Sequence, residues 1–526
     1  MNALAHAYLV PDGTGIEDIK AILQARQQIT AEPTRPVVKK FYDTFDWRIF
    51  NAGGCLWERI DGDKRQLFWE DLQGKQPRLG QALDGEVGFA DQLNPGPVRE
   101  RIAPLSDIRR LLPIVQISSQ VQTLRLLNED EKTVVRIEIE ENRFEEKKRR
   151  RQGILAVRIR VRPIRGYPDA YQEALQILEN ELGLAAAHTP LLLEALTAAG
   201  RTPGDYSSKL DFRLDPDRRA DETAKEILLH LLNTIEVNIP GTRENLDSEF
   251  LHDLRVAVRR TRSALSQIKA VFAPEIVQEY KDRFAWVGQI TGPVRDLDVY
   301  LLDFSDYQQS LPESLRPHLE PLRAFLLDHY EEAQKTLANH LASQAFQDLL
   351  KDWRAFLEAP VPERSAVPNA MRPTKWVADA RIWRMYKRVL REGQAIDAAS
   401  PPEDLHELRK SCKKLRYLLE FFASLYPKKE IRKLIKLLKA LLDNLGRFQD
   451  LAVQAESLRK MAHTMSEEGR ADPDSLLTMG VLVGGLLDHQ ARARQEFAST
   501  FATFDSPSHQ HLFRSLFRPK KKGENL

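Results

Sequence analysis

The sequence predicts a multidomain α+β protein, in which an N-terminal antiparallel, β-barrel-like domain precedes an all-α domain of two tandem four-helix bundles. Over residues 1–205, short runs alternate between apolar and polar residues, which is the period of a strand with one buried face. From residue 220 almost to the C-terminus, apolar residues instead recur at the spacing of amphipathic helices. The helical part also contains one motif twice, which indicates an internal duplication.

The predicted strands of the N-terminal domain are separated by Gly, Asp and Pro. In the run 134–141, the polar residues Arg136, Glu138 and Glu140 share one face, and three arginines share a face in the run 154–162. The charge run between them, 141–153, is interpreted as an exposed, solvated hairpin loop and not as a nucleic-acid-binding tail. The predicted strands are 37–42, 55–60, 66–71, 134–141 and 154–162, and the predicted helices of this domain are 15–28 and 170–182.

Pro and Gly residues divide the chain into segments. We expect the β-rich domain at 1–205, a linker at 206–219, a helical domain at 220–518 with repeats at about 220–360 and 374–510, and a basic, disordered tail at 519–526. Four helices fall in each repeat, which gives the two bundles. The predicted helices are 221–237, a helix around His252, 274–303, 312–357, 374–393, a helix around His406, 428–464 and 474–501.

Each repeat contains a histidine followed by a base three, seven and ten residues later, and the two histidines lie 154 residues apart. At about 100° per residue these positions share one helix face, beside the apolar stripe. An aspartate follows each histidine by 44 residues, as Asp296 and Asp450, which is a second sign of duplication. The faces are His252, Arg255, Arg259 and Arg262 in the first copy and His406, Arg409, Lys413 and Arg416 in the second.

These bases are crowded in a chain that carries almost no net charge. The segment 251–270 contains five bases and one acid, whereas the whole chain has a formal net charge of +2. Like charges on one helix face repel, so the arrangement is favourable only where an anion neutralises it. Arginine binds phosphate oxygens bidentately and lysine adds a point charge, so a phosphate-rich ligand fits. The faces hold almost no aromatic residues that could stack on bases, which favours a thin, base-free polyanion over a nucleic acid.

The pattern H-x-L-R-x-x-x-[RK]-[RK]-x-R, present twice and each time followed by an aspartate motif, resembles the CHAD domain, the conserved-histidine α-helical domain, over about residues 220–515. The resemblance implies that the helical domain binds inorganic polyphosphate through its basic residues. We predict that this binding is non-catalytic and associated with polyphosphate granules. The helix before His406 carries a further basic row with the same spacing. The predicted polyphosphate-binding residues are His252, Arg255, Arg259, Arg260, Arg262, Arg295, Arg384, Arg388, His406, Arg409, Lys410, Lys413, Lys414 and Arg416.

The N-terminal domain carries a second resemblance. Its segments Lys40-Phe41-Tyr42-Asp43-Thr44-Phe45-Asp46-Trp47 and Gly54-Cys55-Leu56-Trp57-Glu58-Arg59 are similar to the CYTH fold of triphosphate tunnel enzymes, over about residues 1–200. That family carries an N-terminal Glu-x-Glu-x-Lys, but this chain has Ala5-His6-Ala7-Tyr8-Leu9 there. The late strand, which usually supplies metal-binding glutamates, here carries arginines, which cannot ligate a divalent cation. We therefore predict a degenerate CYTH-like scaffold with no catalytic and no metal-binding residues.

Two other functions are kept as alternatives. Glu138 and Glu140 could hold a metal ion for hydrolysis of triphosphate or polyphosphate, although Arg136 and the arginine row could neutralise them. A granule scaffold or nucleic-acid-associated protein, tethered by polyphosphate, is the third possibility. The two histidines are interpreted as packing residues, because neither has a second metal ligand at a suitable spacing. No cofactor is predicted, because the sequence has no P-loop or glycine-rich phosphate cradle.

Composition suggests where the protein works. Its two cysteines, Cys55 and Cys412, lie far apart in the sequence, which fits a reducing compartment. Residues 1–10 lack the pattern of a signal peptide, and no apolar run approaches the ~20 residues of a membrane span. The expected location is the cytoplasm, at polyphosphate granules. The expected partners are polyphosphate and other granule proteins, with no membrane and no nucleic acid as the specific ligand.

Overall fold

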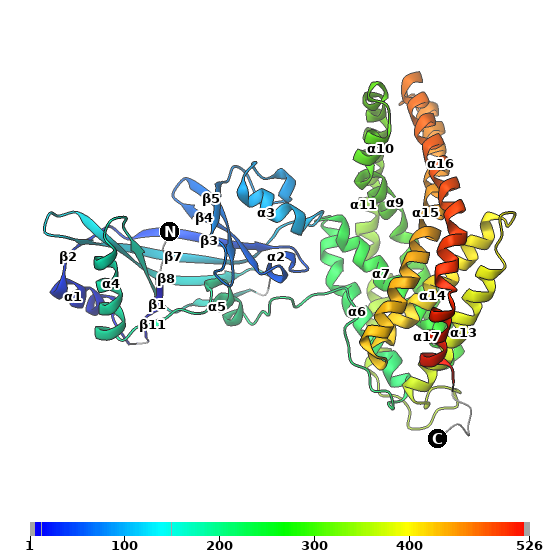
Figure 1. The fold of residues 1–526 in the computed structure, drawn as a ribbon, viewed down its shortest axis with the longest axis horizontal. Coiled ribbons are helices and arrows are strands. Elements are labelled where there is room, and N and C mark those ends of the chain that lie inside the picture. The colour runs from blue at the N-terminus through cyan, green and yellow to red at the C-terminus, as the bar shows by residue number, and fades with distance from the viewer. Residues whose placement is uncertain (1–5, 12, 149, 520–526) are drawn as a thin grey trace. The chain divides into compact units, whose positions relative to one another are not determined.

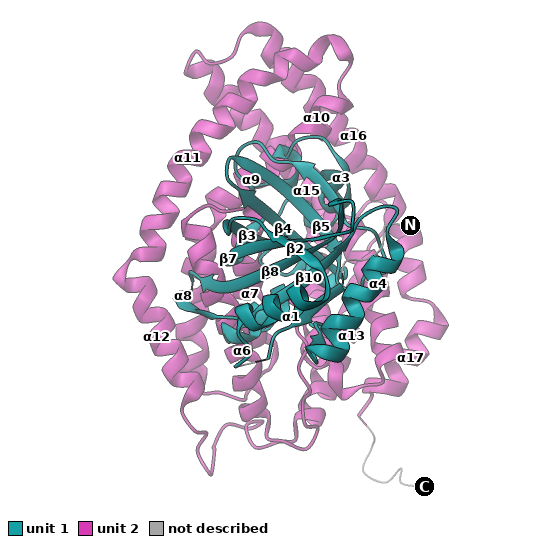
Figure 2. Ribbon diagram, turned by 90° about the vertical axis from the view of Figure 1, so that its left-hand side faces the viewer, with its two compact units in different colours: residues 1–207 teal, residues 208–526 magenta. Residues whose placement is uncertain are grey.

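The computed structural model describes residues 6–11, 13–148 and 150–519. The chain forms two compact units, residues 1–207 and residues 208–526, which are teal and magenta in Figure 2. Unit 1 is built on an antiparallel sheet and unit 2 is helical, so the predicted fold class is confirmed at this level. Residues 520–526 of the predicted tail lie outside the described residues.

Unit 1 contains one large antiparallel sheet. Its strands are β1 (His6–Leu9), β2 (Gln28–Ala31), β3 (Arg35–Asp43), β4 (Gly54–Asp61), β5 (Lys64–Asp71), β6 (Leu79–Ala82), β7 (Leu112–Leu127), β8 (Thr133–Glu146), β9 (Arg151–Ile154), β10 (Arg158–Pro163) and β11 (Ala185–Ala186). They follow the order β11-β1-β10-β8-β7-β3-β4-β5-β6, with β2 paired to β7 and β9 paired to β8. The helices of this unit are α1 (Ile16–Arg26), α2 (Arg48–Asn51), α3 (Pro97–Ser106), α4 (Pro168–Gln176) and α5 (Leu191–Ala198).

The prediction of a hairpin loop at 141–153 was wrong. Strand β8 continues through this charge run to Glu146, and β9 resumes at Arg151. Up to Glu146 every second side chain of the run is buried: Asn142 accepts a hydrogen bond from Ser119 at 2.6 Å, and Phe144 belongs to an apolar core. The charged residues therefore alternate with buried ones, as in a strand with one buried face. The connection between β8 and β9 is a tight turn that is shorter than the predicted loop. The predicted strand 154–162 is interrupted, because β10 begins only at Arg158.

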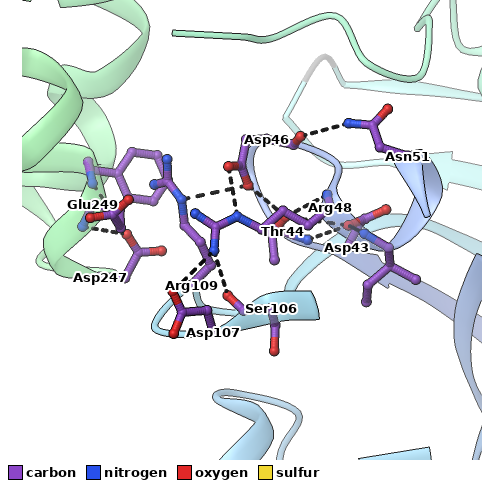
Figure 3. A network of polar contacts seen from close by, with 12 residues as sticks. Asp43, Thr44, Asp46, Arg48, Asn51, Ser106, Asp107, Arg109, Asp247 and Glu249 are labelled. Carbon is purple, nitrogen blue, oxygen red and sulfur yellow. Dashed lines mark hydrogen bonds and ion pairs between the residues drawn. The ribbon is translucent and has the colours of Figure 1, made fainter. Parts of the chain in front are cut away.

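The Tyr-Asp-Thr segment at the end of β3 builds a tight turn into α2 (Figure 3). The buried carboxylate of Asp43 accepts hydrogen bonds from the backbone N–H groups of Thr44, Ile49 and Phe50 at 2.7–2.9 Å. Burial raises the pKa of Asp43 to about 6, against the opposing effect of these three donors. Arg48 donates to Asp46 at 2.9 Å and to the carbonyl oxygen of Ser106 at 3.1 Å, which ties the turn to the end of α3. This part of the motif thus has a structural role.

Unit 2 contains the predicted helices, but two of them are interrupted. Its helices are α6 (Ala220–Arg243), α7 (Ser248–Gln267), α8 (Pro274–Ile290), α9 (Gly292–Leu302), α10 (Phe304–Ser310), α11 (Glu320–Ala342), α12 (Gln344–Glu358), α13 (Thr374–Gln394), α14 (Pro402–Phe421), α15 (Lys428–Glu467), α16 (Pro473–Phe504) and α17 (Pro507–Phe517). The predicted helix 274–303 breaks at Thr291, because Pro293 lacks an N–H group and starts a new helix. The predicted helix 312–357 breaks at Ser343, whose hydroxyl caps α12.

The apolar core of unit 2 does not divide into one cluster per repeat. Leu254 of α7, Trp353 of α12 and Leu415 of α14 belong to a single continuous cluster. A second cluster joins α9, α10 and α11 to the outer halves of α15 and α16, the long helix pair in Figure 1. The repeats therefore share their main core. No helix in the described part of the chain combines the length and the apolarity needed to span a lipid bilayer.

We expect Gly393→Ala to destabilise unit 2 by about 1–3 kcal/mol, because overpacking a filled core has a cost of this size. A Cβ atom at Gly393 would overlap the buried ring of Phe501, and this clash outweighs the higher helix propensity of alanine. Urea unfolding followed by circular dichroism measures the change.

The matched control is Gly480→Ala, in the interior of α16. A Cβ atom there would have no neighbour within 4 Å, so the variant should gain about 0.5–1 kcal/mol. An equal change in the free energy of unfolding for Gly393→Ala and Gly480→Ala would contradict the packing of Phe501 against Gly393.

Candidate functional site

The two helices that carry the repeated motif, α7 and α14, pack against each other within unit 2. Helix α7 begins after Asp247, whose carboxylate accepts hydrogen bonds from the backbone of Glu249 and Phe250. The apolar stripes of both helices, including Leu254 and Leu408, are fully buried in the shared core. Because each basic face adjoins its stripe, burying both stripes brings the two basic faces together.

Arg255 in the first copy is held by the junction between α8 and α9. Its Nη1 atom donates to the carbonyl oxygen of Gly288 at 3.1 Å and to the hydroxyl oxygen of Thr291 at 2.8 Å. Burial lowers the pKa of Arg255, and the carboxylate of Asp296 partly offsets this effect. The guanidinium passes over Gly292, where a Cβ atom would lie 3.8 Å from Nη1. A side chain longer than alanine at that position would meet it.

The second copy repeats this arrangement with a different acceptor. The Nη2 atom of Arg409 donates to the two carboxylate oxygens of Asp450 at 2.9 and 3.2 Å. The same guanidinium passes over Gly446, where a Cβ atom would lie 3.7 Å from Nη2. Gly446 lies 154 residues after Gly292, which is the spacing of the two motifs. The sequence analysis did not single out these glycines, although their equal offset could have identified them.

Lys413 lies where the two copies meet. Its side chain lies at the surface of α14, but its pKa is lowered to about 8, first by burial and then by the positive charges of Arg409 and Arg259, against the opposing charge of Asp450. Arg259 belongs to α7, so the electrostatic coupling runs between the two repeats. Neither Arg259 nor Lys413 has a carboxylate within ion-pair distance in the part of the chain that the structure describes. These two cations are therefore available to an external anion.

Two further arginines share one carboxylate. Arg416 Nε donates to Glu420 at 2.7 Å, and Arg260 Nη2 donates to the other oxygen of Glu420 at 3.3 Å. Arg260 also donates to the carbonyl oxygen of Ser208 at 2.9 Å, and only 13% of its side chain is exposed. One acid thus serves two bases, which leaves an excess of positive charge. We call the joined set the cationic cluster: Arg255, Arg259, Arg260, Arg409, Lys413 and Arg416.

Three other predicted residues have no ion-pair partner among the described residues. Arg262 is exposed on α7, and Arg384 is exposed on α13. Lys414 is half-buried between α14 and α13, where burial and then the charge of Arg388 lower its pKa. Lys414 therefore faces the second basic row rather than the cationic cluster.

The remaining predicted bases are engaged with acids. Arg388 donates to Glu392 at 2.5 Å on the same helix. The surface pair of Lys410 and Glu407 is 2.7 Å apart. Arg295 lies 3.8 Å from Asp298, whose pKa burial raises to about 6 against the opposing charge of Arg295. The pairs of Lys410 and Arg388 are ordinary solvated contacts that contribute little to stability.

The two histidines lie at the edge of the cluster. His406 Nδ1 is 3.2 Å from the side-chain oxygen of Gln449, and His252 is half-buried on α7. Over the described residues, no group of three or more His, Cys, Asp or Glu side chains is arranged to hold a metal ion.

In unit 1, the two carboxylates singled out in the sequence are paired with bases. Glu138 lies 2.8 Å from Arg162, and Glu140 lies 2.9 Å from Lys39 and 3.2 Å from Arg160. Burial lowers the pKa of Lys39 to about 8. Although burial alone would raise it, the charges of Arg160 and Lys39 lower the pKa of Glu140 to about 2.

Strand β1 adds no carboxylate to this face. Its residue Ala7, which pairs with Arg160 of β10, stands at a glutamate position of the CYTH motif, and Leu9, which pairs with Arg158, stands at the lysine position. The face therefore offers salt-bridged carboxylates and alkyl groups, which are poor ligands for a divalent cation.

The comparison with protein families agrees with the geometry of unit 2. Residues 226–459 match the family model of the CHAD domain. The chain contains a CHAD domain. The resemblance of the repeated motif to the CHAD domain is thereby confirmed.

Several solved structures are similar to the chain. The CHAD domain from the plant Ricinus communis is 25% identical over 56% of this chain and 95% of its own, with a TM-score of 0.47. PptA from Streptomyces chartreusis is 17% identical over 54% and 99%, with a TM-score of 0.44. A Hippeastrum protein, described as an adenylyl cyclase with a dominant triphosphatase activity, is 13% identical over 39% and 99%, with a TM-score of 0.27. No curated protein matches the chain.

The coupling between the CHAD repeats can be measured on Lys413. We expect Arg259→Gln to raise the pKa of Lys413 above about 8, because the variant removes a neighbouring positive charge that lowers it. NMR titration of selectively labelled lysine side chains reports the value. Arg283→Gln is the control, because Arg283 pairs with Asp352 and does not act on Lys413. An unchanged pKa in the Arg259 variant would show that the two helices are not coupled.

Proposed function

We propose that the CHAD domain of this chain binds inorganic polyphosphate in the cationic cluster and that the chain does not hydrolyse it. The observation that supports this most directly is the junction of Arg259 and Lys413 across the two repeats. Both bases lack an acidic partner among the described residues, and the pKa of Lys413 is lowered by burial and by its positive neighbours. Such a group gains free energy when an anion arrives, because the anion relieves the repulsion.

The chemistry of the cluster favours a phosphate chain over a nucleic acid. Five of its six members are arginines, whose planar guanidinium groups bind phosphate oxygens bidentately. Tyr417, the aromatic residue nearest to the cluster in sequence, stacks on Phe421. Recognition of single-stranded nucleic acid relies on aromatic platforms for the bases, and a base-free chain needs none. CHAD family members are known for polyphosphate binding, which agrees with this reading.

The members of the cluster have different roles in the proposal. Arg259 and Lys413, which are exposed, contact the phosphate oxygens directly. Arg409 joins them when Asp450, 62% exposed, swings into solvent and releases it. Arg255 and Arg260 are held by backbone carbonyl groups, so they fix the positive field at the base of the site. A ligand of this kind would place the protein at polyphosphate granules in the cytoplasm, with other granule proteins nearby.

The double variant Arg259→Gln/Lys413→Gln should lower the affinity for long-chain polyphosphate at least tenfold. A hydrogen bond to a charged group contributes about 1.5–3 kcal/mol, and each substitution removes at least one. Both side chains are exposed, so the fold should be retained. Isothermal titration calorimetry at a fixed salt concentration measures the loss, since binding of polyanions depends steeply on salt.

The control is Arg323→Gln/Lys351→Gln, which removes the same charge from exposed positions on α11 and α12. It should bind like the unmodified protein. Single-stranded DNA of matched charge is the comparison ligand, and equal affinity for DNA and polyphosphate would defeat the assignment of polyphosphate as the specific ligand.

We also propose that unit 1 is not catalytic. Glu138 and Glu140 are neutralised by Arg162, Arg160 and Lys39, so a metal ion would have to displace these bases first. A metal-dependent hydrolase needs free oxygen ligands, which this face does not offer.

Incubation of the full chain with tripolyphosphate and either Mg²⁺ or Mn²⁺ should therefore release no phosphate above the protein-free blank, as measured by a colorimetric phosphate assay. The variant Glu138→Gln/Glu140→Gln serves as the control for contamination. Phosphate release by the unmodified protein that this variant abolishes would establish the hydrolase instead.

A further inference from the structure

The N-terminal half of α16 (Figure 1) has an apolar face that no other segment covers in the described part of the chain. Residues 475–487 include no charged side chain. On one side of this stretch, Leu482 and Leu486 are buried in the second core cluster. On the other side, the side chains of Leu477, Val481 and Leu487 are 67%, 48% and 46% exposed. Large apolar side chains gathered on one exposed face indicate an interaction surface.

Three glycines lie on the same exposed side of α16. A glycine in a helix interior destabilises the helix by about 0.5–1 kcal/mol relative to alanine. At Gly241 and Gly393, packing explains the glycine, because a Cβ atom would overlap a buried phenylalanine ring. At the three glycines of α16, an added Cβ atom would have no neighbour within 4 Å. We call the whole set the α16 face: Leu477, Gly480, Val481, Gly484, Gly485 and Leu487.

These glycines have a physical use only if another backbone comes close to them. Packing within the described part of the chain does not require them, because the space above them is open. Glycine allows two backbones to approach more closely than any other residue does. The positions of the α16 face share one side of the helix at about 100° per residue, so a second helix could lie along all of them.

Charged residues of opposite sign stand at the two ends of the α16 face. Asp474 comes before the face and Arg492 follows it, both are exposed, and neither has an ion-pair partner among the described residues. They are 18 residues apart, which is about 27 Å along the helix, so they cannot meet within one copy. Asp488, also exposed, lies one turn before Arg492 and gives this arginine a second acid on its own helix.

Two copies of the α16 face complement each other when they run antiparallel. Asp474 and Arg492 lie nine residues to either side of position 483, and Val481 and Gly485 lie two residues to either side of it. A two-fold axis at this position therefore sets each Asp474 against Arg492 of the second copy. It also sets each Val481 against Gly485 of the second copy, where the missing side chain leaves room. Gly484 lies beside the axis, where the two backbones come closest.

We propose that the protein forms a two-fold symmetric dimer in which the α16 faces of two copies pack antiparallel. A two-fold interface uses the same patch on both copies, so the α16 face has to complement only itself. A parallel pair would bring Asp474 beside Asp474 and Arg492 beside Arg492, which is unfavourable. Each copy contributes one helix, so the interface is small and the expected dissociation constant is on the order of micromolar.

Sedimentation velocity of the full chain, from about 1 to 100 µM, should show a monomer–dimer equilibrium. In the variant Gly484→Leu/Gly485→Leu, the dimer affinity should fall at least tenfold, although the face becomes more apolar, because the new side chains keep the two backbones apart. Both positions are exposed and leucine favours a helix over glycine, so the fold should be retained. The matched control, Ala324→Leu/Ala355→Leu, adds two leucines at exposed positions of α11 and α12 and should dimerise normally.

Reversing the charges tests the register. Asp474→Arg and Arg492→Asp should each weaken the dimer at least threefold, because each variant brings like charges together at both ends of the contact. The double variant Asp474→Arg/Arg492→Asp should return the affinity to within about twofold of the unmodified protein, because the ion pairs form again with reversed sign. Losses in the two single variants that simply add in the double variant would overturn this register.

Cysteine crosslinking tests the direction of the two helices. Gly484→Cys should form a disulfide between copies under mild oxidation, because the position lies beside the two-fold axis. Arg492→Cys should not, because its two copies would lie about 27 Å apart. The native cysteines, Cys55 and Cys412, are buried. Gel electrophoresis without reductant measures the product, and crosslinking of both variants would indicate a parallel pair and overturn the proposal.

Other occupants of the α16 face give different results. A monomer at every concentration would overturn the dimer, and so would a dimer that Gly484→Leu/Gly485→Leu leaves unchanged. Binding of a monomer to phosphatidylcholine vesicles, lost in Leu477→Gln/Leu487→Gln, would assign the face to a lipid surface instead. The dimer and the binding of polyphosphate are independent of each other, so each of these results leaves the proposed function in place.

Discussion

The packing of α7 against α14 is the constraint on which the candidate site depends. Each helix buries an apolar stripe in the shared core, and each carries its bases directly beside that stripe. Burial of the stripes supplies the favourable free energy, and it leaves the bases no alternative to lying next to one another. The lowered pKa of Lys413, caused by its burial and its positive neighbours, is the local consequence. The hydrophobic core thus holds a charge arrangement that would be unfavourable by itself.

The duplication places equivalent residues in unequal environments. Arg255 is closed in by the backbone at Gly288 and by Thr291, whereas Arg409 is held by an exposed carboxylate that can move away. In the proposed binding mode, one repeat therefore provides the fixed part of the site, and the other provides the part that responds to the ligand. In unit 1 the charges of the sheet face are instead paired, because Glu138 and Glu140 each lie against an arginine or a lysine. Charges are satisfied internally there, and left in excess in the helical unit.

Several features of the site follow from residue patterns alone. The spacing of the motif identified the basic faces, and the missing glutamates before Leu9 indicated an incomplete CYTH-type site. The run 141–153 shows where such reasoning fails. Its charges suggested a solvated loop, but the neighbouring strand supplied a core for Phe144 and a hydrogen-bond partner for Asn142. A composition-based argument cannot see a partner strand that comes from another part of the chain.

The sequence by itself determined which face of each helix is basic, that the helical part is duplicated, and that the N-terminal segment lacks the glutamates of the CYTH motif. Only the tertiary structure decided that the charge of Arg259 acts on Lys413, that Glu420 serves two arginines, and that Lys410 and Arg388 are paired with neighbouring acids. The physical reason is that periodicity reports how one element divides into faces. Which faces then come together depends on packing between segments far apart in the sequence, and the charge at each contact depends on every group packed there.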